Sequence, residues 1–180
     1  HTRAILVTNP GNPTGVVLSP EEMRLMADIA KEHGLFLISD EVYREFVYGG
    51  EPLASMAQFD DAAENVVVVD SISKRFSACG ARVGILVSRN RELMAQALKI
   101  CQGRLCAATL DQLGAAALYG VGSDYFSAVR EEYHRRRDTC MEGLSQIPGV
   151  VCECPKGAFY LMAKLPVDDT DKFQTWLLEE

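Results

Sequence analysis

Asn12, Asp40 and Lys74 each follow one of three short apolar segments that have the character of β-strands. In an open parallel sheet, ligands bind beyond the carboxyl ends of the strands, because those ends meet at one edge. The pattern therefore predicts that an amide, a carboxylate and an amine converge at one edge of a sheet. It indicates a site there without identifying a reaction.

The three segments are residues 4–8, 35–38 and 65–70, and apolar side chains run through them without alternation. Continuous apolar strands are typical of a parallel sheet that is covered on both faces. A fourth strand is expected at residues 83–87. Strands that alternate with helices in this way predict an α/β fold with a mostly parallel sheet and flanking helices.

The first helix has both a start and a stop signal. Ser19 is the expected N-cap, Pro20 takes the first helical position, and Glu22 completes a capping box. Gly34 is expected to end the helix. Apolar residues recur at helical spacing between these signals, so one face of the helix should be buried.

The pattern becomes helical beyond residue 89 and mixed beyond Pro148-Gly149. We expect three helices, then two short strands, then a last helix after Asp168. The expected helices cover residues 92–102, 110–119 and 124–145, and the expected strands cover residues 150–153 and 158–163.

Composition excludes several classes of function. The chain has 180 residues, of which 48% are apolar and 24% charged, as is typical of a soluble globular protein. No apolar run approaches the roughly 20 residues that span a bilayer, so no membrane partner is expected. The net charge of −7 speaks against nucleic acid. The six cysteines have neither zinc nor disulfide spacing, so we expect reduced thiols, no metal site and a cytoplasmic protein.

Four motifs occur in order along the chain: NPTG at residues 12–15, DEVY at residues 40–43, SISK at residues 71–74 and GARVG at residues 80–84. This series resembles the signature of the class I/II aminotransferases, enzymes of fold type I that depend on pyridoxal 5'-phosphate (PLP). The run of residues 73–80 looks most like bacterial proteins of the aspartate aminotransferase type. The resemblance covers essentially all of the chain.

The resemblance implies a fragment, since family chains are usually about twice as long and both ends look like cuts. Residues 1–122 would be the C-terminal half of the large PLP-binding domain. Residues 123–147 would be a long interdomain helix, and residues 148–180 an incomplete, smaller α+β domain. GAFY at residues 157–160 resembles the start of the sheet in that smaller domain.

The resemblance also implies roles for single residues. Lys74 would bind PLP as an imine, the internal aldimine, and would then move the substrate Cα proton as general base and acid. Lysine must be neutral for this, and nearby positive charge or desolvation can lower its pKa. Asp40 would pair with the protonated pyridine nitrogen and keep the ring electron-poor.

Further residues would hold the ring and the phosphate. Tyr43 and Asn12 would hydrogen-bond the phenolic oxygen of PLP. Arg82 and Ser71 would bind the phosphate, with charge-assisted hydrogen bonds from the guanidinium. Ser73 is a further candidate phosphate ligand.

Each of these residues also has a plainer explanation. Asp40 could cap a helix that begins at Glu41, Asn12 could be a turn residue, and Tyr43 could be part of the core. A lone lysine or arginine, such as Lys74 or Arg82, is usually a solvated surface residue.

The preferred interpretation is an aminotransferase that moves an amino group between an α-amino acid and a 2-oxo acid, with a homodimer as the whole enzyme. Two alternatives stay open: a PLP-dependent lyase or decarboxylase on this fold, and the effector domain of an aminotransferase-like regulator. A nucleotide-binding domain is disfavoured, because the sequence has no GxGxxG or GxxxxGK[ST] loop. The family's phosphate loop and ring-stacking aromatic would lie upstream, and its substrate-carboxylate arginine downstream. We therefore expect the chain alone to be inactive, and the pattern does not predict the amino donor.

Overall fold

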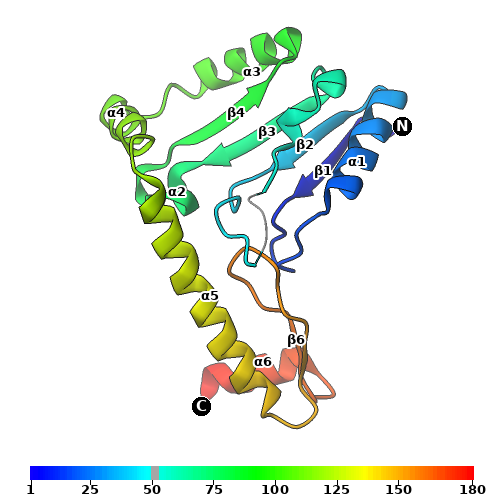
Figure 1. Ribbon diagram of the computed structural model, residues 1–180, viewed down its shortest axis with the longest axis vertical. Helices are drawn as coiled ribbons and strands as arrows, with labels where there is room; N and C mark the ends of the chain where they lie inside the picture. Colours follow the sequence, from blue (N-terminus) through cyan, green and yellow to red (C-terminus); the bar gives the residue numbers. More distant parts are fainter. Residues whose placement is uncertain (50–52) are drawn as a thin grey trace.

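A four-stranded sheet forms the centre of the computed structural model, which describes residues 1–49 and 53–180 (Figure 1). The strands lie in the order β1 (Ala4–Thr8), β2 (Phe36–Asp40), β3 (Val66–Ser71) and β4 (Gly84–Ser88). The first three are parallel, and β4 runs antiparallel to β3. The predicted α/β fold with a mostly parallel sheet is confirmed.

Helix α1 (Pro20–Glu32) follows the local sequence signals closely. The Ser19 hydroxyl accepts a hydrogen bond from the Glu22 N–H at 3.2 Å, and the Glu22 carboxylate accepts one from the Ser19 N–H at 2.7 Å. Gly34 follows the helix with a φ of +60°, a conformation that a residue without Cβ adopts readily. The predicted capping box and the end of this helix are confirmed.

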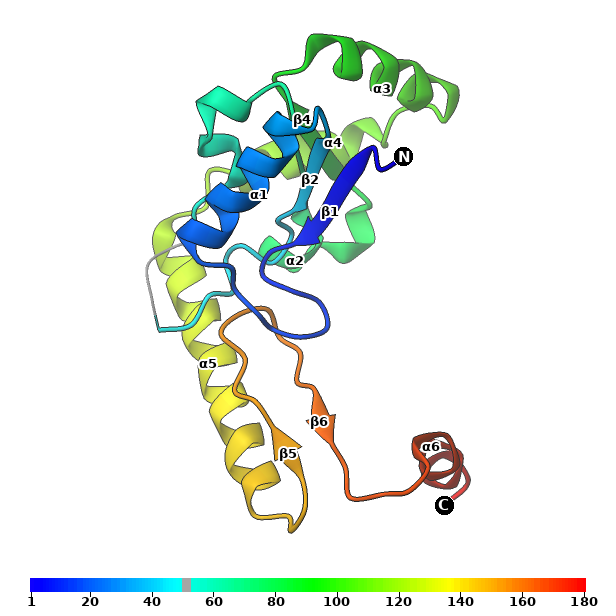
Figure 2. The ribbon, with the colours of Figure 1, turned by 90° about the vertical axis from the view of Figure 1, so that its right-hand side faces the viewer.

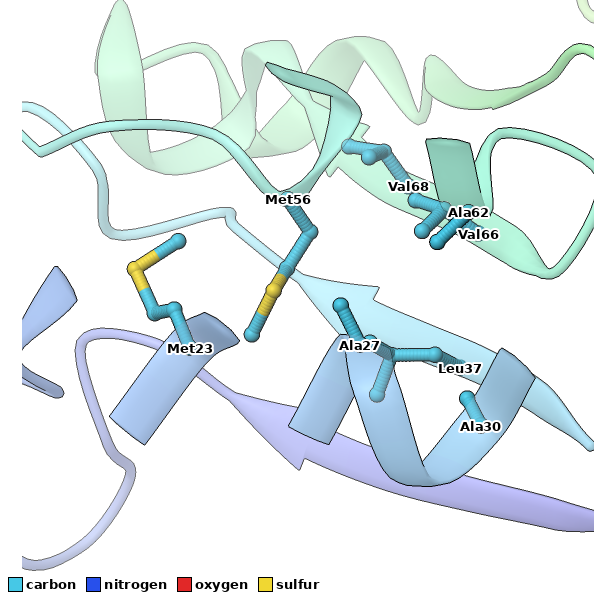
Figure 3. Close-up of a cluster of buried hydrophobic side chains, with 8 residues drawn as sticks. All are labelled: Met23, Ala27, Ala30, Leu37, Met56, Ala62, Val66 and Val68. Atoms are coloured by element: carbon cyan, nitrogen blue, oxygen red, sulfur yellow. The ribbon is translucent and has the colours of Figure 1, made fainter. Parts of the chain in front are cut away.

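Helix α1 covers one face of the sheet (Figure 2). Its buried residues pack against β2, β3 and the short helices that follow β2, and this cluster is drawn in Figure 3; it consists of Met23, Ala27, Ala30, Leu37, Met56, Ala62, Val66 and Val68. On the opposite face, Val67 of β3 is 4% exposed but Leu6 of β1 is 72% exposed. The prediction of a sheet covered on both faces is therefore wrong at β1.

Short elements connect the sheet strands, and longer helices follow β4. The short ones are η1 (Met56–Gln58), η2 (Asp60–Ala62), α2 (Ile72–Arg75) and η3 (Cys79–Ala81). The longer ones are α3 (Arg91–Gly103), α4 (Thr109–Leu118) and α5 (Ser123–Ser145), each within one residue of its predicted bounds. None of the helices of the described residues is long and apolar enough to cross a membrane.

Helix α5 leads away from the sheet to the remaining elements (Figures 1 and 2). These are β5 (Val151–Cys152), which pairs antiparallel with β6 (Ala163–Lys164), and α6 (Thr170–Glu179). The prediction of a strand at residues 158–163 is wrong, because Ala158 lies in a turn with a φ of +56°, and β6 begins only at Ala163. The division of the chain into domains stays a prediction.

Residues 155–161, here called the return segment, bring the chain back to the sheet after β5 (Figure 2). The N–H groups of Lys156 and Gly157 both donate to the Gly15 carbonyl at 2.9 Å. The Ala158 N–H donates to the Phe46 carbonyl at 2.8 Å. Residues far apart in the sequence therefore meet beside the loops that follow β1 and β2.

Candidate functional site

The carboxyl ends of the three parallel strands meet at one edge of the sheet. Thr8 ends β1 and is paired with Asp40, the last residue of β2. Ser71 ends β3 and is paired with Gly84, the first residue of the antiparallel β4. The backbone of Arg82, two residues before Gly84, therefore lies at the same edge as Ser71.

Tyr43 is the best-connected side chain among the predicted site residues. Its hydroxyl accepts a hydrogen bond from the Asn12 amide at 3.5 Å and shares another with the Tyr160 hydroxyl at 2.5 Å. Burial raises the pKa of the phenol above its usual value, and the bond to Tyr160 and the nearby Asp40 carboxylate raise it further. Tyr43 therefore keeps its proton at neutral pH.

Asp40 lies close to this phenol and begins a turn. Its Oδ1 accepts a hydrogen bond from the Val42 N–H at 3.1 Å, which fixes the direction of the carboxylate. Residues 42–45 form a turn and not a helix, so the plainer expectation of a helix beginning at Glu41 is wrong.

Lys74 lies in α2, a single helical turn that directly follows β3. Its Nζ lies 5.7 Å from the centre of the Phe159 ring, within the range of a cation–π contact. The same ring makes an edge contact with Tyr43, with centroids 5.2 Å apart. Phe159 thus connects the amine to the phenol, and Lys74 forms no ion pair with any residue that the structure describes.

Ser71 and Arg82 are bonded within their own loops. The Ser71 hydroxyl accepts a hydrogen bond from the Ser73 N–H at 3.2 Å and caps α2. The Arg82 guanidinium is exposed and donates to the Cys79 carbonyl at 2.7 Å. Within the described ranges, no hydrogen bond or ion pair joins either side chain to Lys74 or Asp40, so the structure brings these residues together through their backbones alone.

Comparison with known proteins shows the family of the chain. The family described as aminotransferase class I and II matches residues 1–180. The chain belongs to this family. Aspartate aminotransferase of Bacillus subtilis (strain 168) is 33% identical to it, over 99% of this chain and 48% of that protein. A probable aspartate/prephenate aminotransferase of Aquifex aeolicus (strain VF5) is 37% identical, over 89% of this chain and 42% of that protein.

Solved structures agree with the fold. The crystal structure of an aromatic aminotransferase from Pyrococcus horikoshii OT3 superposes with a TM-score of 0.89 and 31% identity. It is matched over 99% of this chain and 49% of that chain. The chain spans about half the length of the curated relatives it matches, as the resemblance predicted.

Two site residues of this aminotransferase-family chain escape prediction from the sequence. Phe159 and Tyr160 reach Lys74 and Tyr43 from the return segment. The GAFY motif is their signal in the sequence, but the motif alone indicates a strand of the other sheet. The contact arises because the turn at Ala158 directs both rings toward the loop after β2.

The buried carboxylate of Glu41, between Asp40 and Tyr43, is a third feature whose role the sequence motifs do not reveal. Its Oε1 accepts hydrogen bonds from the hydroxyls of Ser39 and Ser55 and from the Met56 N–H, at 2.9 to 3.2 Å. These bonds tie the turn after β2 to the segment that leads into η1. Glu41 therefore helps to fix the direction in which the neighbouring site residues leave the sheet.

A cavity of about 170 Å³ lies between α5 and the return segment. Phe159 and Tyr160 line it, together with Tyr133 and Arg137 of α5. None of the six predicted site residues lines this cavity. The two rings therefore separate the cavity from the edge that carries Lys74.

Proposed function

We propose that the chain binds PLP and supplies the lysine of an enzyme that moves an amino group between an α-amino acid and a 2-oxo acid. Membership of the aminotransferase family supports amino transfer. The arrangement of Lys74, Tyr43, Asn12 and Asp40 at one sheet edge is the observation that carries the cofactor assignment.

The donor set at this edge fits PLP. Asp40 offers a carboxylate of fixed direction for a protonated pyridine nitrogen, and Tyr43 with Asn12 offers donors for the ring hydroxyl. Ser71 and Arg82 offer donors for a phosphate at the neighbouring strand end. When bound, PLP supplies an electron-poor ring that takes up the charge left when a proton leaves the substrate Cα.

Lys74 would hold the cofactor covalently through Nζ and later carry the proton. An amine that reacts must be able to lose its own proton, and a carboxylate bonded to it would oppose this. Within the described residues, Nζ contacts the face of the Phe159 ring and forms no ion pair. The ring would help to direct the amine, and Nζ would act as base and then as acid.

Tyr43 would donate a hydrogen bond to the ring oxygen of PLP. Because burial raises its pKa, the phenol holds its proton at neutral pH and remains a donor. Asn12 and Tyr160 fix the position of this hydroxyl from two sides. Tyr43 would thereby favour the ionised form of the cofactor's oxygen.

Arg82 and Ser71 would bind the phosphate. A guanidinium has five N–H donors, and the bond to the Cys79 carbonyl uses one of them. The remaining donors can bind phosphate oxygens in pairs, which gives Arg82 an advantage over lysine. The Ser71 hydroxyl retains its own proton for donation, since it accepts from the Ser73 N–H.

Borohydride trapping after addition of PLP tests the cofactor assignment directly. Reduction should leave a stable label on Lys74, which peptide mapping locates. Lys99, an exposed lysine of α3, is the matched control. Label on Lys74 alone supports the proposal, whereas equal label on Lys74 and Lys99 overturns it.

Assays of the whole protein, with any residues that flank this chain, test the reaction. An amino-acid panel with 2-oxoglutarate should yield a new amino acid and a new 2-oxo acid. Release of ammonia or carbon dioxide would identify a lyase or a decarboxylase in its place. We expect the 180 residues alone to bind PLP weakly and not to transaminate, so turnover by this chain would contradict that expectation.

A further inference from the structure

Arg75, the residue after the candidate lysine, joins two loops of the site. Its side chain is 11% exposed. The Nη2 atom lies 2.6 Å from Oδ2 of Asp70 in β3, and Nε lies 3.5 Å from Oε1 of Glu45. Glu45 belongs to the turn after β2 that also carries Tyr43. One guanidinium therefore bridges the strand end before Lys74 and the turn that holds the phenol.

Helix α2 needs such outside support. It has four residues, and a single helical turn is unstable on its own because nucleation fixes several dihedral angles for one hydrogen bond. Ile72 and Phe76 anchor one side of it in a cluster with α4 and α5. Lys74 lies between these anchors, so its direction depends on how the rest of the turn is held.

The bridge lies in partly buried surroundings. Asp70 is 8% exposed, and burial raises the pKa of its carboxyl while the Arg75 charge lowers it. The rings of Tyr119 and Phe76 lie about 6 Å from the guanidinium carbon, at 5.8 and 6.0 Å. A planar guanidinium suits this place, because it can lie over rings while it hydrogen-bonds Asp70 and forms an ion pair with Glu45.

We propose that Arg75 is a positioning residue that holds Lys74 at a fixed distance from Tyr43. The ion pair with Glu45 joins α2 to the turn after β2, and the ion pair with Asp70 joins α2 to the end of β3. Lys74 lies next to Arg75 in the sequence, and Tyr43 lies in the same turn as Glu45. The consequence for cofactor chemistry rests on the function proposed above. The geometric part does not, since it concerns the folded chain without cofactor.

Hydrogen–deuterium exchange on the cofactor-free protein tests the geometric part. The Phe76 N–H donates to the Ile72 carbonyl at 3.2 Å and reports on the opening of α2. Arg75→Met should speed its exchange about tenfold or more, because the charged hydrogen bond to Asp70 and the ion pair with Glu45 are lost. Arg89→Met is the matched control, since Arg89 forms an exposed ion pair with Asp60.

Competitive acetylation of Lys74 against Lys99 separates positioning from stability. If Arg75 only stabilises the fold, the ratio of the acetylation rates of Lys74 and Lys99 in the folded protein should be the same in Arg75→Met as in wild type at each pH. If it positions Lys74, the pH profile of that ratio shifts in Arg75→Met and is partly restored in Arg75→Lys. Glu45→Gln should give an intermediate shift, because it leaves the pair with Asp70 intact.

The rate of PLP addition to Lys74 gives the functional reading. We expect Arg75→Met to slow it about tenfold and Arg89→Met to leave it unchanged. If the wild-type protein does not add PLP at Lys74, the proposed function is overturned. The hydrogen–deuterium exchange of the cofactor-free protein then still tests whether Arg75 joins the two loops. The positioning role is overturned if Arg75→Met has the same hydrogen–deuterium exchange, the same pH profile of acetylation and the same rate of PLP addition as the wild-type protein.

Discussion

The two sides of the candidate site are built differently. On the Tyr43 side, the backbone is closely packed: a Cβ on Gly157 would lie 2.7 to 2.9 Å from atoms of Val17, Pro10 and Phe46. On the Arg82 side, a Cβ on Gly80 would meet no atom within 4 Å. The first side is formed by segments from distant parts of the chain, the second by a loop that bonds to itself.

This difference indicates which contacts are fixed before a ligand arrives. Tyr43 is held by Asn12 and Tyr160, whose backbones belong to segments that are hydrogen-bonded to each other. Arg82 has an exposed side chain and a bond within its own loop. The Tyr43 side is therefore held in place by distant segments, whereas the Arg82 side can adjust; under the proposed function these sides would hold the ring and the phosphate of PLP.

Substitution of Gly157 should have the largest effect on stability. In Gly157→Ala the new methyl group meets backbone and ring atoms that cannot move aside, so we expect a loss of about 1–3 kcal/mol of unfolding free energy. Gly80→Ala should change it by less than about 0.5 kcal/mol. Urea unfolding of both variants measures the contrast, and equal losses would contradict the comparison.

Tyr48→Phe should have the next largest effect. The buried Tyr48 hydroxyl donates to the Ala158 carbonyl at 2.5 Å, so its removal leaves that carbonyl unsatisfied at a cost of about 1–2 kcal/mol. Burial raises the Tyr48 pKa to about 12, from an ordinary value of 10.0. The folded state therefore keeps this proton longer than the unfolded state does.

The sign of the pH dependence follows from linkage. The stability due to this raised pKa is fully present below pH 10 and is lost as pH rises through about 12. Urea unfolding of wild type and Tyr48→Phe at a series of pH values measures this. The difference between their free energies of unfolding should become smaller as pH rises from 10 to about 12. If this difference in free energy becomes larger above pH 10, the Tyr48 hydroxyl is not buried and bonded to the Ala158 carbonyl as the structure indicates.

Tyr160→Phe tests the link between the return segment and the phenol. Besides burial, the hydrogen bond to Tyr160 and the charge of Tyr160 itself raise the pKa of Tyr43, so removal of the Tyr160 hydroxyl should lower that pKa. Ultraviolet titration of the tyrosines measures the shift, with Tyr125→Phe as a control away from this pair. We expect about 0.5–1.5 kcal/mol of lost stability. An unchanged Tyr43 titration would separate Tyr160 from the site.

The sequence predicts features that are encoded locally. The start of α1 depends on Ser19 and Glu22, two residues three positions apart that bond to each other, so its capping box is predictable. The positions of Asp40 and Lys74 at strand ends follow from apolar runs. Their roles toward PLP stay predictions.

Features that depend on distant contacts are not predictable in this way. The expected strand at residues 158–163 fails because Ala158 takes a positive φ without being glycine, and it does so where its N–H and carbonyl bond to Phe46 and Tyr48. The nearness of Phe159 to Lys74 depends on the same return of the chain. The exposure of Leu6 likewise depends on which segments pack against β1, and the local sequence pattern does not predict those contacts.

Arg82→Lys should have the smallest effect on stability and should thereby sharpen the contrast between the two sides. The side chain is exposed and donates a hydrogen bond to the Cys79 carbonyl within its own loop, so the free energy of unfolding should change by less than about 0.5 kcal/mol. Affinity for PLP should still fall about tenfold, because an ammonium cannot bind phosphate oxygens in the paired geometry of a guanidinium. Urea unfolding and PLP titration of the same preparation measure both quantities. A large loss of stability would mean that the Arg82 loop is as tightly built as the Tyr43 side, and unchanged affinity would remove Arg82 from the phosphate site.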